Sequence, residues 1–202
     1  MRPEDKEAHP RTTVTLRNGA EAVLRPLSIQ DGRRLGDFYE TVPRDDFRFY
    51  RPHPLDRAHA MANAADAHSA LEAAIVMETP DGEIAGYAWC RWQDHGAEKS
   101  NFGICIRRDY QGIGAGAKLI GRLLEIVRAV GPPVVSLTVQ KANARALSLY
   151  RRCGFQVVRE QMRPEDTLNG FAAESEYYME QRLRQGRGSE PIRARRFERT
   201  DR

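Results

Sequence analysis

The chain has few cysteines and no long apolar segment. Cys90, Cys105 and Cys153 lie far apart and form no CxxC pair, so the sequence predicts neither a disulfide framework nor a zinc site. The first two lie in apolar runs that are typical of buried thiols. No apolar run approaches the ~18 residues of a membrane span, and the N-terminal MRPEDKEAHPRT lacks the apolar centre of a signal peptide. We therefore expect a cytoplasmic protein with no membrane partner.

Net charge is also nearly absent outside the last residues. The chain carries +4 in total. Residues 182–202 hold eight arginines against three acidic residues, a balance of +5, so the remainder carries about −1. A basic tail can contact nucleic acid or an anionic surface. Its glycines and proline favour a solvated, disordered end instead, and we do not favour a nucleic-acid partner.

The 202 residues fit one domain with irregular ends. We expect a disordered N-terminus at 1–11, a folded domain at 12–183 and the basic, disordered tail at 184–202. Asn18-Gly19 predicts an early hairpin with a strand centred on 22–25. Ser28, with Asp31 three residues later, predicts the start of a helix that ends before Pro43.

Apolar periodicity predicts the remaining elements. Further helices are expected at about 55–65, 114–129 and 143–153, and strands at LEAAIVMET, EIAGYAWCRWQ, NFGICIR, VVSLTVQ, FQVVREQ and SEYYMEQRL. Early hairpin-like strands, one central βαβ unit and two late strands indicate an α/β (α+β) domain with a single crossover. The sequence shows no internal repeats.

The segment RRDYQGIGAGAKL, residues 107–119, places three glycines directly before a predicted helix. Such loops let backbone N–H groups approach a phosphate at the positive end of the helix. A Walker-type loop is excluded because Lys118 follows Ala117 rather than glycine, and Leu119 stands where a hydroxyl is needed.

A dinucleotide fingerprint fits Gly112, Gly114 and Ala117 by letters alone. The next strand ends in Gln140, however, and offers no acid for a ribose hydroxyl. Two readings remain from the residues: a cradle for the pyrophosphate of coenzyme A, and a tight strand-to-helix turn that binds nothing.

Two motifs resemble the GNAT superfamily of N-acetyltransferases. QGIGAG is similar to that superfamily's [RQ]xxGx[GA] signature, and NARALSLYRRCGF matches its NxxAxxxYxxxGF segment from Asn143 to Phe155. The resemblance covers about residues 14–183. The early AVLRPLSIQD, followed by FRFYRP, is similar to the bacterial branch that includes protein-lysine acetyltransferases. The resemblance to the superfamily implies a single GNAT-like domain. Its mixed sheet of about six to seven strands would be splayed at the strands before and after the glycine-loop helix and flanked by about four helices.

The resemblance also implies acetyl-CoA (coenzyme A) as co-substrate. Backbone N–H groups of the glycine loop would bind the pyrophosphate, backbone groups of the preceding strand the pantetheine amides, and an asparagine amide the pantetheine arm. The residues in these roles are Gln111, Gly112, Ile113, Gly114, Ala115, Gly116, Ala117, Ile104, Ile106 and Asn143. Gly103 suggests a bulge in that strand. The histidines form no HExxH-like pair, so no metal is expected.

The reaction implied is direct attack of an amine on the thioester. A lysine-like ammonium has a pKa of ~10.4 and a thiol of ~8.5, so both ends need help with protons at neutral pH. Tyr150 is the acid that the resemblance implies. Asn143, Ala146 and Tyr150 share one helix face, which would meet the thiol end of the cofactor if the helix packs beside the glycine loop. Glu98, on the strand before the loop, is the candidate general base. A water chain using backbone carbonyls and the Ser136 or Thr138 hydroxyl is the alternative.

The expected function is therefore acetyl-CoA-dependent N-acetylation of a primary amine, either a small molecule or a protein lysine. The acceptor should bind between residues 38–54 and the late strands. The alternative is a catalytically weak module that binds acyl-CoA and regulates another process. A homodimer is a possible assembly.

Overall fold

Eight strands form one mixed sheet at the centre of the computed structural model. The structure describes residues 8–50, 52–167 and 170–183. Most of the expected disordered N-terminus, residues 1–7, and the whole basic tail lie outside them. The strand order is β1-β2-β3-β4-β5-β6-β8-β7. The strands are β1 (Thr12–Thr15), β2 (Glu21–Pro26), β3 (Glu72–Glu78), β4 (Ile84–Arg91), β5 (Lys99–Ile106), β6 (Val134–Gln140), β7 (Gln156–Arg163) and β8 (Glu174–Arg182).

The sheet has more strands than the six to seven predicted. The additional strand is β1, a short and mostly exposed edge strand whose pattern is weak. It pairs with β2 across the predicted hairpin. The other strands form where apolar and β-branched residues predicted them.

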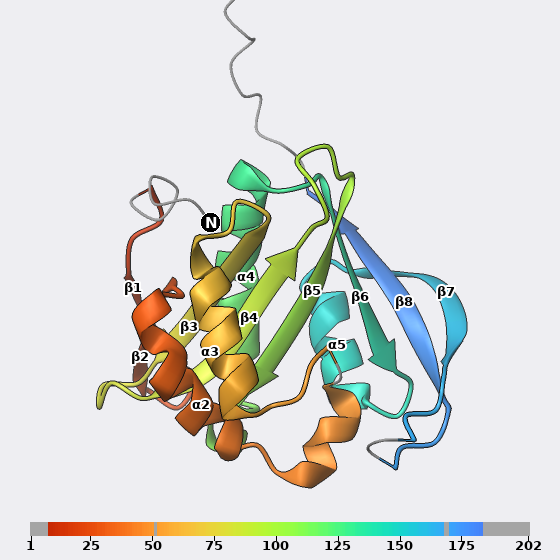
Figure 1. The fold of residues 1–202 in the computed structure, drawn as a ribbon, viewed down its shortest axis with the longest axis horizontal. Coiled ribbons are helices and arrows are strands. Elements are labelled where there is room, and N and C mark those ends of the chain that lie inside the picture. Colours follow the sequence, from red (N-terminus) through yellow and green to blue (C-terminus); the bar gives the residue numbers. More distant parts are fainter. Residues whose placement is uncertain (1–7, 51, 168–169, 184–202) are drawn as a thin grey trace, which may run out of the picture.

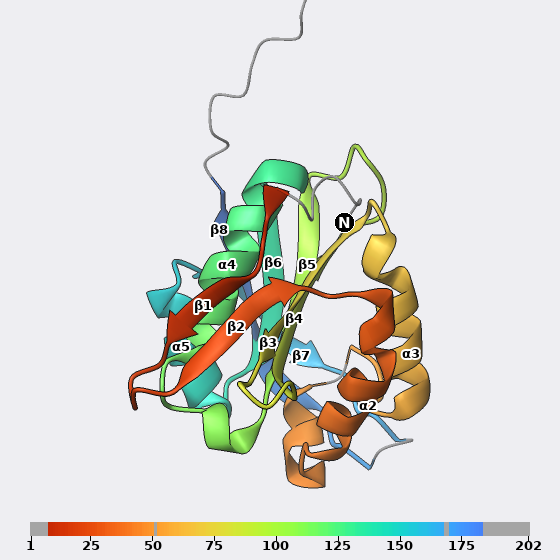
Figure 2. The ribbon, with the colours of Figure 1, turned by 90° about the vertical axis from the view of Figure 1, so that its left-hand side faces the viewer.

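Helices cover both faces of the sheet (Figures 1 and 2). They are α2 (Gly32–Glu40), α3 (Arg57–Ala65), α4 (Ala115–Val130) and α5 (Ala144–Arg152), with short 3₁₀ helices η1 (Ile29–Asp31), η2 (Arg44–Phe49), η3 (Asp66–His68) and η4 (Arg108–Tyr110). The α2–α3 pair covers one face, and α4 and α5 cover the other. In the part of the chain that the structure describes, no helix is both long and apolar enough to cross a membrane.

The two central strands separate along their length. β5 and β6 run parallel and are joined through α4, which is the predicted crossover. They pair only from Lys99–Asn101 to Val134–Ser136, and Figure 1 shows them diverging beyond that point. All other neighbouring strands are antiparallel. The predicted splay is therefore present.

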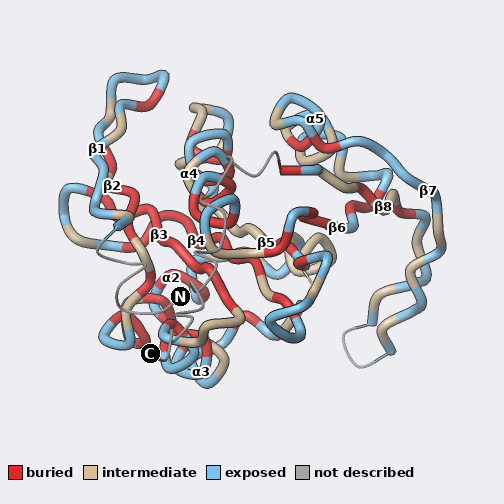
Figure 3. Tube along the Cα trace, turned by 90° about the horizontal axis from the view of Figure 1, so that it is seen from above, coloured by how far each residue is buried: buried red, intermediate tan, exposed pale blue. Residues whose placement is uncertain are grey.

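Two hydrophobic cores hold this arrangement, one on each side of the sheet (Figure 3). On one side, Leu119 and Leu123 of α4 are fully buried against the sheet. On the other side, Phe38 and Tyr39 of α2 pack with Tyr87 of β4. Fully burying each such side chain contributes about 1.5–3 kcal/mol, so the sheet is held from both faces.

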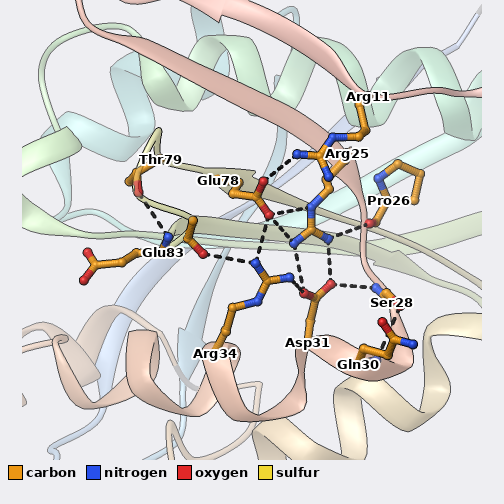
Figure 4. Close-up of polar contacts among 11 residues, drawn as sticks. Arg11, Arg25, Pro26, Ser28, Gln30, Asp31, Arg34, Glu78, Thr79 and Glu83 are labelled. Carbon is orange, nitrogen blue, oxygen red and sulfur yellow. Dashed lines mark hydrogen bonds and ion pairs between the residues drawn. The ribbon is translucent and has the colours of Figure 1, made fainter.

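A buried ionic network fixes the start of α2 to the sheet (Figure 4). Arg25 of β2 donates to both oxygens of Asp31, at 2.7 and 2.9 Å, and to Oε2 of Glu78 on β3. Asp31 is fully buried and also accepts from the Ser28 backbone N–H at 2.9 Å, which completes the predicted capping box. Arg34 of α2 contacts both acids.

The network also sets the protonation of its acids. Burial opposes ionisation of Asp31, but the hydrogen bonds and positive charge of Arg25 outweigh it, so the pKa of Asp31 lies below its ordinary value. The pKa of Glu78 is lowered by the same balance. Both acids are therefore ionised at neutral pH, and Arg25 and Arg34 together compensate their charges.

We predict that Arg25→Met lowers the free energy of unfolding by about 3 kcal/mol, because fully buried Asp31 would lose its bidentate partner and keep only the partly exposed Arg34. Urea denaturation at pH 7 measures the change. Arg33→Met is the control: Arg33 is an exposed residue of α2, and its loss should change stability by less than about 0.5 kcal/mol. Equal effects of the two variants would contradict the role given to Arg25.

This stabilisation should depend on pH with a defined sign. A carboxyl whose pKa is lowered on folding stabilises fully above its unfolded pKa, ~3.9 for Asp, and the stabilisation is lost as the pH falls through the folded value. The difference between the wild-type protein and Arg25→Met should be largest at about pH 7 to 8 and shrink as the pH falls toward 3, because Asp31 is protonated more easily in the variant. Denaturation curves across this range check it, and an undiminished difference at pH 3 would contradict it.

Candidate active site

Two adjoining cavities occupy the open end of the splay. The inner cavity, about 320 Å³, lies between the C-terminal half of β5 and helix α5. The front cavity, about 400 Å³, lies between η2, β6 and the segment that follows β7. Phe49, Tyr50, Ile104 and Tyr150 line both cavities, so the two meet at these four side chains.

Backbone groups of β5 face the inner cavity. Arg107 donates its N–H to Ala85 on the β4 side, at 2.9 Å. Backbone groups alternate along a strand, so those of Ile104 and Ile106 point to the opposite side, where β6 has already diverged. The Ile106 carbonyl there accepts from Gln111 Nε2 at 2.9 Å. Both predicted isoleucines therefore line the cavity with their backbone directed into the gap.

The glycine loop presents a row of backbone donors at the start of α4. Gly112 and Gly114 have φ of 80° and 97°, which other residues rarely adopt. Among the described residues, the N–H groups from Gly112 to Ala117 meet no acceptor. A Cβ added to Gly112 would stand in open space. The loop is therefore a concave set of N–H groups at a helix N-terminus, which is the arrangement that binds anions.

Helix α5 brings its predicted face to the inner cavity. Asn143, Ala146 and Tyr150 all line it. Asn143 Oδ1 accepts from the Ala146 N–H at 3.1 Å and caps the helix, which leaves its amide nitrogen for other contacts.

Tyr150 lies at the junction of the cavities. Its ring packs edge-on against Phe102 of β5 and Phe155, with centroids 5.9 Å apart in each pair. Its hydroxyl has no hydrogen-bond partner among the described residues. Burial raises the pKa of Tyr150, so the phenol stays protonated at neutral pH. The site thus holds a protonated phenol whose hydroxyl has no partner in the part of the chain that the structure describes.

Gly103 does not mark a bulge, because the β4–β5 register runs unbroken through Trp89↔Gly103. The glycine is required for another reason. A Cβ at this position would lie 2.5 Å from carbons of the Trp89 indole, closer than real contacts allow. The indole therefore lies directly over β5 at the front cavity, which Gly103 lines.

Glu98 is not brought to this site. It is exposed and precedes β5, at the end where β5 and β6 are still paired. At ~3.3 Å per residue, it lies about 20 Å along the strand from Ile104. Glu98 is two residues before Ser100 and has the spacing to share its face of the strand, but this spacing carries no information on where the two strands separate. Of the alternative hydroxyls, Ser136 is committed to the Ser100 carbonyl at 2.9 Å, whereas Thr138 lines the front cavity.

The front cavity is lined by residues that the sequence did not single out. Arg163, Glu165 and Asp166 reach it from the segment around the end of β7, and Tyr50 reaches it from the end of η2. The segments were expected to hold the acceptor, but no motif marks these side chains. The available signal was composition: RDDFRFY and RPED place both charge signs and aromatics beside predicted loops.

Neither cavity offers an ionised nucleophile from sulfur. Cys105 lines the inner cavity, and burial raises its pKa to about 12, so its thiol stays protonated. Cys90 is fully buried, as expected. Residues 8–50, 52–167 and 170–183 contain no group of three or more His, Cys, Asp or Glu residues arranged to hold a metal ion.

Comparisons with known proteins identify the family to which this fold belongs. Residues 37–155 match the sequence model of the Acetyltransferase (GNAT) family. The L-methionine sulfoximine/L-methionine sulfone acetyltransferase of Pseudomonas aeruginosa is 30% identical over 86 residues, which cover 41% of this chain and 50% of that protein. The chain spans half or less of the length of the curated relatives it matches.

Solved structures share the whole fold. The GNAT domain of S. lividans PAT has a TM-score of 0.67 at 20% identity, covering 86% of this chain and 97% of that domain. The spermidine N-acetyltransferase of Vibrio cholerae, in complex with CoA and spermine, has a TM-score of 0.66 at 22% identity, covering 81% and 96%. The family match covers more than half of this chain, and the splayed sheet agrees with it. The protein belongs to the GNAT family of acetyltransferases.

Proposed function

We propose that this protein transfers an acetyl group from acetyl-CoA to the primary amine of a small molecule by direct attack on the thioester. The observation that carries the proposal is the Tyr150 hydroxyl, which has no partner among the described residues and stands where the two cavities meet. One cavity would hold the pantetheine arm and the other the amine, so the reacting atoms would meet beside this phenol.

The residues present fit acetyl-CoA as a substrate. The N–H groups from Gly112 to Ala117 have no acceptor in the described chain and would bind the pyrophosphate. The backbone of Ile104 and Ile106 would pair with the pantetheine amides, much as an added strand would. The Asn143 amide nitrogen would contact the same arm.

Arg145 adds positive charge at the glycine loop. It lines the inner cavity and donates to Gln111 Oε1 at 2.6 Å. A guanidinium at this position would draw the phosphates toward the helix N-terminus. The loop, the strand and α5 thus supply contacts along the length of the substrate.

Tyr150 would act as the acid of the reaction. As the amine nitrogen bonds to the carbonyl carbon and the C–S bond breaks, the sulfur needs a proton or a hydrogen bond. A buried phenol with a raised pKa keeps its proton until that moment. The protonated Cys105 thiol argues against an acetyl-enzyme intermediate at that residue, which supports direct transfer.

The front cavity favours a small acceptor. At about 400 Å³ it falls within the ~300–1,000 Å³ usual for small-molecule sites. The Glu165 and Asp166 carboxylates reach it and would attract an ammonium group, with Phe49 offering an apolar wall. Relatives named for methionine sulfoximine and for mycothiol agree with a small acceptor.

The experiment that tests the function is thiol release from acetyl-CoA in the presence of an amine panel. The panel includes methionine sulfoximine, spermidine and a lysine peptide. Amine-dependent thiol release supports the transferase, and a preference for the small amines supports the acceptor class. Tight acetyl-CoA binding without release for any amine would instead indicate a binding module.

Tyr150→Phe should lower kcat by about 10²–10⁴-fold, the range for losing a proton donor. The hydroxyl makes no hydrogen bond to the described chain, so its removal should leave the fold and acetyl-CoA affinity nearly unchanged. Tyr177→Phe is the matched control, because Tyr177 lies on β8 and lines neither cavity. A Tyr150→Phe enzyme with wild-type kcat would remove this residue from the chemistry.

Gly112→Ala should raise the Kd for coenzyme A by at least about tenfold, measured by calorimetry, because the loop can no longer present its N–H groups at the same φ. Gly82→Ala is a close control. Gly82 has φ of 82° and open space around it, like Gly112, but lies in the β3–β4 turn. Equal affinities in the two variants would show that backbone strain alone, and not ligand contact, explains the glycine.

A further inference from the structure

A tyrosine–histidine pair stands at the junction of the two cavities. Tyr50, which follows η2, lines both of them. Its hydroxyl lies 3.1 Å from Nε2 of His53. The two rings meet edge-on, with centroids 5.4 Å apart. A tyrosine that lines both cavities is thereby connected through its hydroxyl to an imidazole.

The contacts of His53 define which of its nitrogens carries the proton. Nδ1 lies 2.8 Å from the Pro54 carbonyl, which can only accept, so Nδ1 is the donor. Nε2 then offers its lone pair to the Tyr50 hydroxyl. Asn63 Nδ2 also points at Nε2, at 3.1 Å, while Asn63 Oδ1 accepts from Arg91. The pair is therefore oriented with the imidazole as acceptor.

Trp89 holds the phenol in place from the other side. Its indole N–H donates to the Tyr50 hydroxyl at 3.1 Å. The same indole lies over β5 because position 103 is glycine. Trp89 donates to one lone pair of the Tyr50 oxygen, and the Tyr50 proton is directed to His53. A hydroxyl oxygen has two lone pairs, so the Tyr50 oxygen keeps one for a substrate.

The surroundings of His53 keep it neutral and connect it to solvent. Its neighbours are Tyr39 of α2, Tyr50, Arg91 of β4, and Asp56 and His59 at the start of α3. Burial lowers the pKa of His53, and the positive charges of Arg91 and His59 add to this. The His53 and His59 rings stack, with centroids 5.7 Å apart. His53 is only partly buried, so a proton that reaches it can leave to solvent.

We propose that Tyr50 accepts a proton from the acceptor amine while it passes its own proton to Nε2 of His53. The proposal rests on the proposed function and supplies the base that Glu98 does not. An ammonium acceptor loses two protons on becoming an amide. One leaves through Tyr50 and His53 to solvent, and the other replaces the proton that Tyr150 gives to the sulfur. The N–C bond forms, the C–S bond breaks, and the protons balance.

The test is the pH dependence of kcat at saturating amine and acetyl-CoA. In the wild-type protein, kcat should fall as the pH drops through the pKa of His53, which burial holds below its ordinary value of ~6.5, because His53 must be neutral to accept a proton. His53→Gln should lower kcat about 10²-fold and abolish this acid limb, with the KM for acetyl-CoA unchanged. Free imidazole should restore part of the activity of His53→Ala. Tyr50→Phe should lose kcat to a similar degree.

His59→Gln is the control, because His59 stacks on His53 but does not contact Tyr50. It should keep both kcat and the acid limb. A wild-type profile with no acid limb at any pH at which the protein stays folded overturns the relay, even if every His53 variant fails to fold. If His53→Gln keeps the wild-type kcat and the acid limb, the relay is overturned but the proposed function is not. No turnover by the wild-type protein with any amine overturns the proposed function and the relay with it.

Discussion

The rest of the structure depends on the separation of β5 from β6. A central strand with one free edge would leave buried backbone groups without partners, which costs free energy. Here the pairing ends at Asn101↔Ser136, and the strand continues to Ile106 beside a cavity instead of a neighbour. The opening exposes polar backbone in the middle of the sheet, and the glycine loop and α5 are both arranged around it.

The helices on the two faces of the sheet stabilise the gap between β5 and β6 in different ways. Helix α4 is anchored by a continuous apolar face, so the N–H groups at its start point in a constant direction. On the opposite face, the Arg25 network fixes the start of α2 between β2 and β3. Polar side chains on that face converge below Tyr50, where Trp89 and His53 both bond to its hydroxyl. The apolar packing of α4 on one face and the polar contacts around Tyr50 on the other thus define the two cavities.

Much of the architecture could be predicted from local patterns. The positions of the helices, the crossover and the splay followed from periodicity and two motifs, since glycines before a helix and a tyrosine on the face of Asn143 are local features. The features that were missed are not local. Glu98 has the right spacing from its strand, but lies at the closed end because pairing with β6 decides where the gap begins. Gly103 looked like a bulge, while its reason is the indole of Trp89, fourteen residues earlier in the chain and on another strand.

The sequence by itself therefore determined the family, the order of elements and the loop that can bind an anion, because these depend on residues close together in the chain. The tertiary structure decided which side chains meet. Tyr50 and His53 are close in the chain, but Trp89 comes from β4 and Tyr150 from α5, and both lie near Tyr50 only in the folded protein. No local spacing relates Trp89 or Tyr150 to this pair, since their proximity results from the way the front loop folds over the diverging strands.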